Sequence, residues 1–390
     1  MTMLFLLVMI YIAFISLGLP DSLLGSAWPT MYGGMGVPVS YAGIISMIIA
    51  GGTILSSFFS EKVIKKLGTG VVTAISVFMT AVALLGFSVS GSFPLLCVCA
   101  VPLGLGAGSV DAALNNYVAL HFKAKHMNWL HCFWGIGATA GPVIMSYSLL
   151  SVGKWQMGYR IIGIVQLVLV VFLVVTLPLW KKTEKKEEAQ EEKTSIRLKE
   201  LLQLPGAKAA LTAFFCYCAV EATTGLWGSS YLVMVRGIDA QKAAKWISLF
   251  YFGITFGRLL AGFVTMKLNN RQLIRMGQGI LAVGIILVLL PFGSSLTVPG
   301  LFLIGMGCAP IYPSLLHETP ENFGSRYSQA IMGIQMSCAY VGSTFMPPLF
   351  GLIASHISYH LFGFYLGVLL LLMVIMVEIL NKRIGNRSKG

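Results

Sequence analysis

The sequence predicts an all-α membrane protein with about twelve transmembrane helices in two pseudo-symmetric six-helix bundles. Three observations support this class: 56% of the residues are hydrophobic and only 11% are charged, the mean hydropathy is +0.82, and the charges are confined to short stretches. No Asp, Glu, Lys or Arg occurs in 67–110, 276–317 or 327–377. Each of these runs can hold two apolar spans of about 20 residues, the length that crosses a bilayer. The spans are therefore expected as helical hairpins.

Glycine, proline and serine mark the turns of these hairpins, near 33–38, 88–94 and 291–299. Basic residues gather at the opposite ends of the hairpins, and the positive-inside rule makes that side cytoplasmic. We therefore expect a multi-pass protein of the cell (plasma or inner) membrane with both termini in the cytoplasm. The net charge of +13 comes mostly from these basic cytoplasmic residues, which also attract anionic lipid headgroups. The charge therefore predicts no nucleic-acid partner.

A charged segment divides the chain. We predict an N-terminal six-helix bundle over 1–180, a charged cytoplasmic linker over 181–206, and a C-terminal six-helix bundle with a short cytoplasmic tail over 207–390. Residues of the two halves match at displacements of 200 to 205 positions; the pairs are Asp21 and Glu221, Gly104 and Gly305, and Gly137 and Gly342. Such ordered repetition indicates a duplicated bundle, with a binding site expected between the halves.

Three acids lie inside predicted spans. Asp21 is the only charged residue in 1–60. A charge at mid-bilayer costs roughly 2.5–3.5 kcal/mol, so an acid retained there usually faces a polar cavity. Asp111 and Asn115 are four residues apart and share a helical face, and Glu221 repeats Asp21 in the second half. Asp21, Asp111 and Glu221 are therefore predicted to bind and release protons, although a structural carboxyl hydrogen-bonded between helices is the alternative for Asp21.

Polar and aromatic side chains of the spans are candidates for solute binding. His131 and Trp134 share a face of the fifth span, where an imidazole and an indole can line a cavity; a packing role is the alternative for the histidine. Two prolines flank Tyr312 and interrupt the tenth span, and such breaks normally line a cavity or bend a gating helix. An indole of Trp28 or Trp134 can stack on a sugar ring. The candidates are Asn115, His131, Trp134, Trp28, Tyr217, Tyr312 and Gln335.

Arg258 lies toward the cytoplasmic end of the eighth span. Its guanidinium can pair with a carboxylate, extend to the membrane surface, or close an inner gate. These three interpretations stay open from the sequence, and we count Arg258 among the gating candidates.

Several motifs resemble one transporter family. The segment Glu61-Lys62, followed by Lys65-Lys66-Leu-Gly68, resembles the loop signature of the major facilitator superfamily, with glutamate for its usual aspartate and lysines for its arginines. The segments Leu19-Pro-Asp21, Asp111-Ala-Ala-Leu-Asn115, Asn128-Trp-Leu-His131-Cys-Phe-Trp134 and Tyr217-Cys-Ala-Val-Glu221 resemble the fucose:proton symporter group of that superfamily.

The resemblance implies the major facilitator fold over essentially the full length, proton coupling at the matching acids, sugar binding by the fifth span, and gating by Glu61 and Lys62. Two positions depart from the group: His131 stands where the fucose transporter has glutamine, and Asp111 stands where glutamate is usual.

Residues and resemblance together predict proton-coupled symport of a small neutral solute, above all a hexose, by a monomer that works through alternating access. Desolvation disfavours the charged form of a buried carboxyl, which allows it to exchange protons. Sodium coupling stays open because carboxylates and carbonyls serve either ion. The competing functions are a proton-coupled exporter of amphipathic compounds and a membrane sensor that binds a ligand without moving it. The sequence contains no nucleophile elbow, H-E-x-x-H motif or clustered metal ligands, so no enzyme, cofactor or metal site is predicted.

Overall fold

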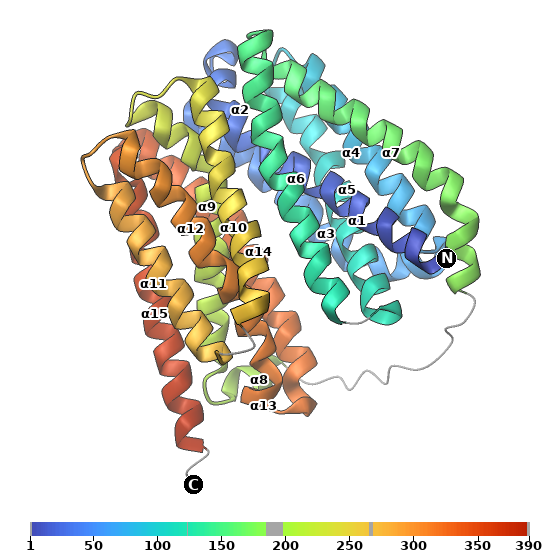
Figure 1. Ribbon diagram of the computed structural model, residues 1–390, viewed down its shortest axis with the longest axis vertical. Helices are drawn as coiled ribbons and strands as arrows, with labels where there is room; N and C mark the ends of the chain where they lie inside the picture. Colours follow the sequence, from blue (N-terminus) through green and yellow to red (C-terminus); the bar gives the residue numbers. More distant parts are fainter. Residues whose placement is uncertain (1, 123, 185–197, 265–267, 388–390) are drawn as a thin grey trace. The chain divides into compact units, whose positions relative to one another are not determined.

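The computed structural model describes residues 2–122, 124–184, 198–264 and 268–387. All regular elements in these ranges are helices, most of them long enough to cross a bilayer (Figure 1). Half of the predicted linker over 181–206, residues 185–197, lies outside the described residues. The helix before this gap ends at Glu184 and the next helix begins at Leu198, so both enter the predicted linker.

Contacts divide the chain into two compact units, which we describe separately. Unit 1 comprises Met1–Ala189 with Leu232–Ser248, and unit 2 comprises Gln190–Tyr231 with Leu249–Gly390. The helices of the first part of the chain are α1 (Thr2–Asp21), α2 (Leu23–Met31), η1 (Gly33–Met35), η2 (Val39–Tyr41), α3 (Ala42–Leu67), α4 (Thr69–Val89), α5 (Phe93–His121), α6 (Ala124–Ser151) and α7 (Trp155–Glu184).

The second part of the chain continues the pattern of long helices. Its elements are α8 (Leu198–Gln203), α9 (Ala207–Met234), α10 (Ala240–Val264), α11 (Asn270–Leu289), α12 (Ser294–His317), α13 (Thr319–Phe323), α14 (Ser325–His356), η3 (Tyr359–Leu361) and α15 (Phe362–Arg387). The end of α9 and the start of α10 are grouped with unit 1.

Eleven helical stretches of the described residues are long and apolar enough to cross a membrane, and the first of them combines α1 and α2. Helix α10 is not among the eleven, although it has 25 residues and is long enough at about 1.5 Å per residue. Lys242, Lys245 and Arg258 lower its hydropathy. The predicted all-α membrane class is confirmed, and we count α10 as the twelfth span.

The repeated glycines are used in the same way in the two units. In unit 1, Gly104 of α5 lies against the backbone of α3, and Gly137 of α6 lies against the backbone of α1. In unit 2, Gly305 of α12 lies against the backbone of α10, and Gly342 of α14 lies against the backbone of α9. Each glycine lets two helices approach more closely than a side chain would permit. The matching displacements in the sequence thus correspond to matching helix contacts.

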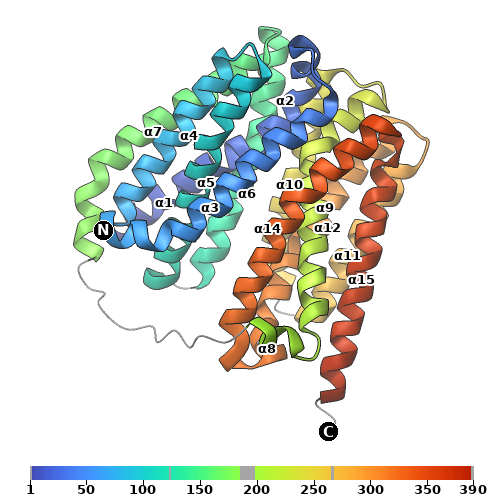
Figure 2. The same ribbon diagram turned by 180° about the vertical axis from the view of Figure 1, so that it is seen from behind.

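Helices α8 and α13 lie at the end of unit 2 at which α15 ends (Figures 1 and 2). An apolar cluster there joins Leu201 of α8, Phe323 of α13 and Leu380 of α15. Helix α8, which lies within the predicted linker, is therefore fixed to the bundle by buried side chains.

Candidate functional site

Close packing of α1 and α6 positions the first predicted acid. Gly18 of α1 faces the backbone of Trp134, and Gly137 of α6 faces the backbone of Ile15. A methyl group at either glycine would overlap main-chain atoms of the other helix, which cannot move aside as a flexible side chain can. The glycines thus fix the height and rotation of α6 against α1.

Asp21 and Trp134 meet at this contact. Helix α1 contains Pro20 and ends at Asp21. The Trp134 indole Nε1 donates a hydrogen bond to the Asp21 carboxylate Oδ2 at 2.8 Å. The Asp21 side chain is exposed and the Trp134 ring is half-buried. The structure therefore joins an accessible carboxylate to the edge of an aromatic ring, and both residues were predicted from sequence.

His131 lies one turn before Trp134 on α6. Its ring is half-buried and meets Phe14 of α1 edge to face, with ring centroids 6.0 Å apart and an interplanar angle of 86°. The imidazole is therefore held at the α1–α6 contact, near the Asp21–Trp134 pair along the same helix.

Asp111 and Asn115 form a second polar group of unit 1. The Asn115 amide nitrogen donates to the Asp111 side-chain Oδ1 at 2.9 Å and to the Asp111 carbonyl oxygen at 3.0 Å. Both residues are half-buried. The same helix packs through Gly104 and Gly108 against α3, where Thr53 donates to the Gly104 carbonyl oxygen at 3.2 Å. The predicted acid and amide thus act on each other within α5.

In unit 2, Glu221 lies in a group of polar and aromatic side chains from three helices. The Tyr217 hydroxyl donates to the Glu221 carboxylate one turn along α9. Arg258 of α10 interacts electrostatically with Glu221, Tyr217 and Tyr312 of α12. Glu221 and Arg258 are half-buried, whereas Tyr217 is fully buried. The structure places Arg258 within electrostatic range of Glu221, and its role stays a prediction.

Ring contacts hold Tyr312 in this group. Its ring centroid lies 5.8 Å from that of Tyr217 and 5.0 Å from that of Phe214. Its hydroxyl donates to the Met336 Sδ of α14 at 3.4 Å. Helix α12 runs without interruption through Pro310 and Pro313, so the predicted break of this span is wrong. The continuous helix presents Tyr312 toward α9 and α14.

Two other candidates have different surroundings. Trp28 has an exposed fraction of 0%, and its indole Nε1 donates to the Val39 carbonyl oxygen at 2.6 Å. Gln335 is buried and accepts a hydrogen bond from the Thr319 hydroxyl at 3.0 Å. In this conformation, Trp28 has no uncovered face for stacking on a sugar.

The residues of the predicted loop signature form the last turns of α3, with Gly68 as its C-cap, and are described only in part. The exposed Lys62 ammonium lies 5.9 Å from the centroid of the Phe59 ring, a distance typical of a weak cation–π contact. The Glu61 side chain lies outside the described residues. The predicted gating role of these two residues stays a prediction.

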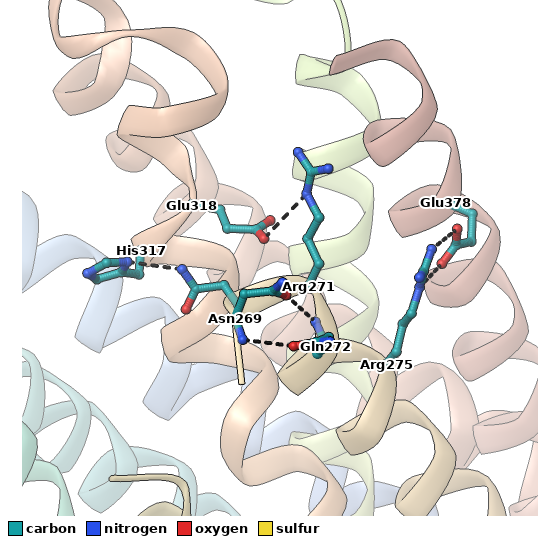
Figure 3. Close-up of polar contacts among 8 residues, drawn as sticks. Asn269, Arg271, Gln272, Arg275, His317, Glu318 and Glu378 are labelled. Atoms are coloured by element: carbon teal, nitrogen blue, oxygen red, sulfur yellow. Dashed lines mark hydrogen bonds and ion pairs between the residues drawn. The ribbon is translucent and has the colours of Figure 1, made fainter. Parts of the chain in front are cut away.

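A charged network that the sequence did not predict lies at the start of α11 (Figure 3). Arg275 makes two hydrogen bonds with Glu378 of α15, at 2.8 and 2.7 Å. Arg271 lies 3.9 Å from Glu318, which is 4% exposed. Asn269 and Gln272 form a capping box that begins the helix. The available signal was that Glu378 is the only acid in 322–390.

The Arg275–Glu378 pair is expected to contribute little to stability. Both side chains are about half exposed, and exposed ion pairs typically contribute roughly 0.2–1 kcal/mol. Glu378→Gln should therefore lower the free energy of unfolding by less than about 1 kcal/mol, and added salt should shrink the difference. Thermal unfolding of the purified protein at low and high salt measures this effect. A loss above about 2 kcal/mol would contradict the surface-pair interpretation.

The described residues hold no group of three or more His, Cys, Asp or Glu side chains that could bind a metal ion. The seven cysteines are free thiols. The contacts of the candidate residues described above are hydrogen bonds, ring contacts and charge interactions among the chain's own side chains.

These features define a polytopic helical membrane protein with acids inside its bundles. A family model described as the Major Facilitator Superfamily matches residues 10–340 and, in a second match, 246–385. The chain belongs to the major facilitator superfamily and is a secondary transporter, not an enzyme.

Individual relatives are distant. The chain is 26% identical over 291 residues to bypass of stop codon protein 6 of Saccharomyces cerevisiae, a match that covers 67% of this chain and 57% of the relative. It is 26% identical over 242 residues to the glucose/mannose transporter GlcP of Bacillus subtilis, with 60% of each covered. The matches thus span less than two thirds of either relative. A crystal structure of the nucleoside transporter NupG superposes with a TM-score of 0.77 at 15% identity, covering 95% of this chain and 98% of that one.

Proposed function

We propose that this transporter couples proton entry to the uptake of a small neutral solute, a hexose or related sugar, by alternating access. The observation that carries the proposal is the Asp21–Trp134 pair of unit 1, with a 2.8 Å hydrogen bond between indole and carboxylate. A carboxylate accepts strong hydrogen bonds from hydroxyl groups, and the apolar face of an indole suits the C–H face of a sugar ring. The hydrogen bond holds the ring in place before the solute arrives.

Proton coupling is supported by the different surroundings of the acids. Among the described residues, the side chain that contacts the Asp111 carboxylate is an uncharged amide. We propose that Asp111 binds a proton and releases it when water reaches it. One charge moved through 100 mV supplies about 2.3 kcal/mol, which is enough to concentrate a neutral solute.

Glu221 lies within electrostatic range of Arg258. We propose that neutralising this carboxylate weakens its attraction to the guanidinium and so changes how α9 and α10 are held together within unit 2. In this proposal, Glu221 is the acid that couples proton binding to the packing of α9 against α10. Asn115, His131, Tyr217, Tyr312 and Gln335 are proposed to supply hydrogen bonds and aromatic surface, and the stacking role is assigned to Trp134 rather than the covered Trp28.

The proposal includes the membrane topology: both termini in the cytoplasm of a cell-membrane protein that works as a monomer. Labelling of cysteines introduced near either terminus in intact and permeabilised cells tests the orientation. Reaction in intact cells would place that terminus outside.

Replacing Asp21 by asparagine should abolish proton-driven accumulation but retain exchange. The amide resembles the protonated acid, so the solute can still be carried, but no proton can leave. In proteoliposomes with an imposed pH gradient, Asp21→Asn should reduce accumulation of labelled hexose at least tenfold, because the sugar loses the driving energy of the coupled proton, about 2.3 kcal/mol for a gradient equivalent to 100 mV. Counterflow of preloaded sugar should continue.

The wild-type protein decides between this function and its alternatives in the same assay. An exporter of amphipathic compounds would leave the labelled sugar outside, and a sensor would show no counterflow. Uptake that follows a sodium gradient and ignores pH would replace protons by sodium as the driving ion.

The solute is identified by thermal stability of the purified protein with sugars, polyols and nucleosides. A ligand at 100 times its dissociation constant stabilises the folded state by about 2.7 kcal/mol, so a true solute should raise the apparent Tm. Trp134→Ala should remove the shift because it removes the stacking face, whereas Trp134→Phe should retain part of it. Absence of a shift with any carbohydrate would count against a sugar.

A further inference from the structure

One end of unit 2 contains a hollow that the transport function does not use. It has a volume of about 560 Å³ and is lined by Lys199, Leu202 and Gln203, which belong to α8, and by Lys208 of α9. Most of its wall is apolar, and the two lysine side chains are exposed. Its volume lies within the range of roughly 300–1,000 Å³ found for small-molecule sites.

The frame of the hollow is fixed by packing. Leu201 of α8 is 3% exposed within the cluster that contains Leu380 of α15. The turn to α9 passes through Gly206 at φ +85°, and a methyl group at this glycine would crowd the Leu380 side chain. The Tyr327 hydroxyl donates to the Glu200 carboxylate at 3.1 Å. The packing of Leu201 and the hydrogen bond to Glu200 therefore fix α8, the helix that carries Lys199.

The charge at this end is positive. Within the described ranges, Lys199 and Lys208 form no ion pair, and the neighbouring Glu200 accepts the Tyr327 hydroxyl. Lys382 and Arg383 add two exposed cations on α15, next to Leu380 of the same apolar cluster. An occupant of the hollow should therefore combine a negative group with an apolar part.

We propose that the hollow binds one anionic phospholipid, with its phosphate between Lys199 and Lys208 and the start of an acyl chain over Leu202. Three observations favour a lipid over a free anion: the mostly apolar wall, the position of α8 at the ends of membrane-spanning helices, and the clustering of basic residues, which attracts anionic headgroups at a membrane surface. The bound lipid would tie α8, and with it the start of α9, to the bilayer.

The test uses the full-length purified protein and phosphatidylglycerol as the probe. Mixed micelles of phosphatidylcholine with phosphatidylglycerol should raise the apparent Tm by about 2–4 °C over phosphatidylcholine alone, and labelled phosphatidylglycerol should stay bound after washing. Lys199→Gln with Lys208→Gln should remove both effects, while the Tm in phosphatidylcholine alone stays unchanged because both side chains are exposed. The matched control, Lys154→Gln with Lys245→Gln, removes two exposed lysines elsewhere and should behave as wild type.

Three results would overturn the proposal. Equal stabilisation by inorganic phosphate would assign the hollow to a free anion. Equal loss of binding in both double variants would show a general charge effect. Retained binding in Lys199→Gln with Lys208→Gln would mean that another part of the chain binds the lipid.

Discussion

Glu221→Gln is expected to destabilise the protein by about 1.5–3 kcal/mol, because the carboxylate accepts a hydrogen bond from the buried Tyr217 hydroxyl. The substitution also removes a negative charge that attracts the half-buried Arg258 guanidinium. The apparent Tm should fall by several degrees, measured by thermal unfolding of the purified protein in detergent.

The double variant Glu221→Gln with Arg258→Gln tests the cause. When both charges are removed, the Arg258 guanidinium is no longer left without a nearby carboxylate, so part of the lost stability should return. Glu378→Gln is the matched control, since it removes the same chemical group from an exposed Arg–Glu pair of the same unit. If the double variant is less stable than either single variant, Arg258 and Glu221 act independently and the pairing is wrong.

Gly137→Val should strongly destabilise unit 1. The first atom of the new side chain would overlap the Ile15 carbonyl oxygen and approach the Leu19 backbone nitrogen. Overpacking usually costs about 1–3 kcal/mol when side chains can yield. Here the obstacle is main chain, so α1 and α6 must separate, and we expect a loss at or above the upper end, with reduced yield of folded protein.

Separation of α1 from α6 should also disturb the hydrogen bond between Asp21 and Trp134. Asp21 and Trp134 are joined across this helix contact, so Gly137→Ala, the milder change, should weaken solute binding more than its loss of stability explains. Thermal shifts with the identified solute, compared at temperatures at which both proteins are folded, measure this.

Gly279→Ala provides the control. This glycine is in α11, and a methyl group there meets nothing within 4 Å. Alanine is favoured over glycine inside a helix by about 1 kcal/mol, so Gly279→Ala should be neutral or stabilising. Equal damage from both alanine variants would mean that glycine is needed for a reason other than close packing.

The composition and the spacing of charges predicted the helical membrane class, because insertion into a bilayer depends on the local run of apolar residues. Glycine spacing predicted where helices approach, and the contacts of Gly104 and Gly305 agree with it. Hydropathy did not identify α10 as a span, because Lys242, Lys245 and Arg258 lower its mean hydropathy. The candidate site was predictable as a set of residue types on helical faces.

Partners across helices were not predictable in the same way. Trp134 lies 113 positions after Asp21, and Arg275 lies 103 positions before Glu378. A pairing over such distances depends on the rotation and height of two helices, which many packed side chains fix together. The sequence left three roles open for Arg258 and offered Trp28 as a stacking residue, whereas the fold brings Arg258 within electrostatic range of Glu221 and covers Trp28.

The sequence by itself determined that this chain is a membrane protein, that it consists of two related sets of helices, and that it carries acids at membrane depth, since each property follows from neighbouring residues along the chain. Only the tertiary structure decided which acid faces a cation, which faces an amide and which faces an indole. The physical reason is that a carboxyl group's chemistry is set by the atoms within a few ångströms of it, and in a helical bundle those atoms come from other helices.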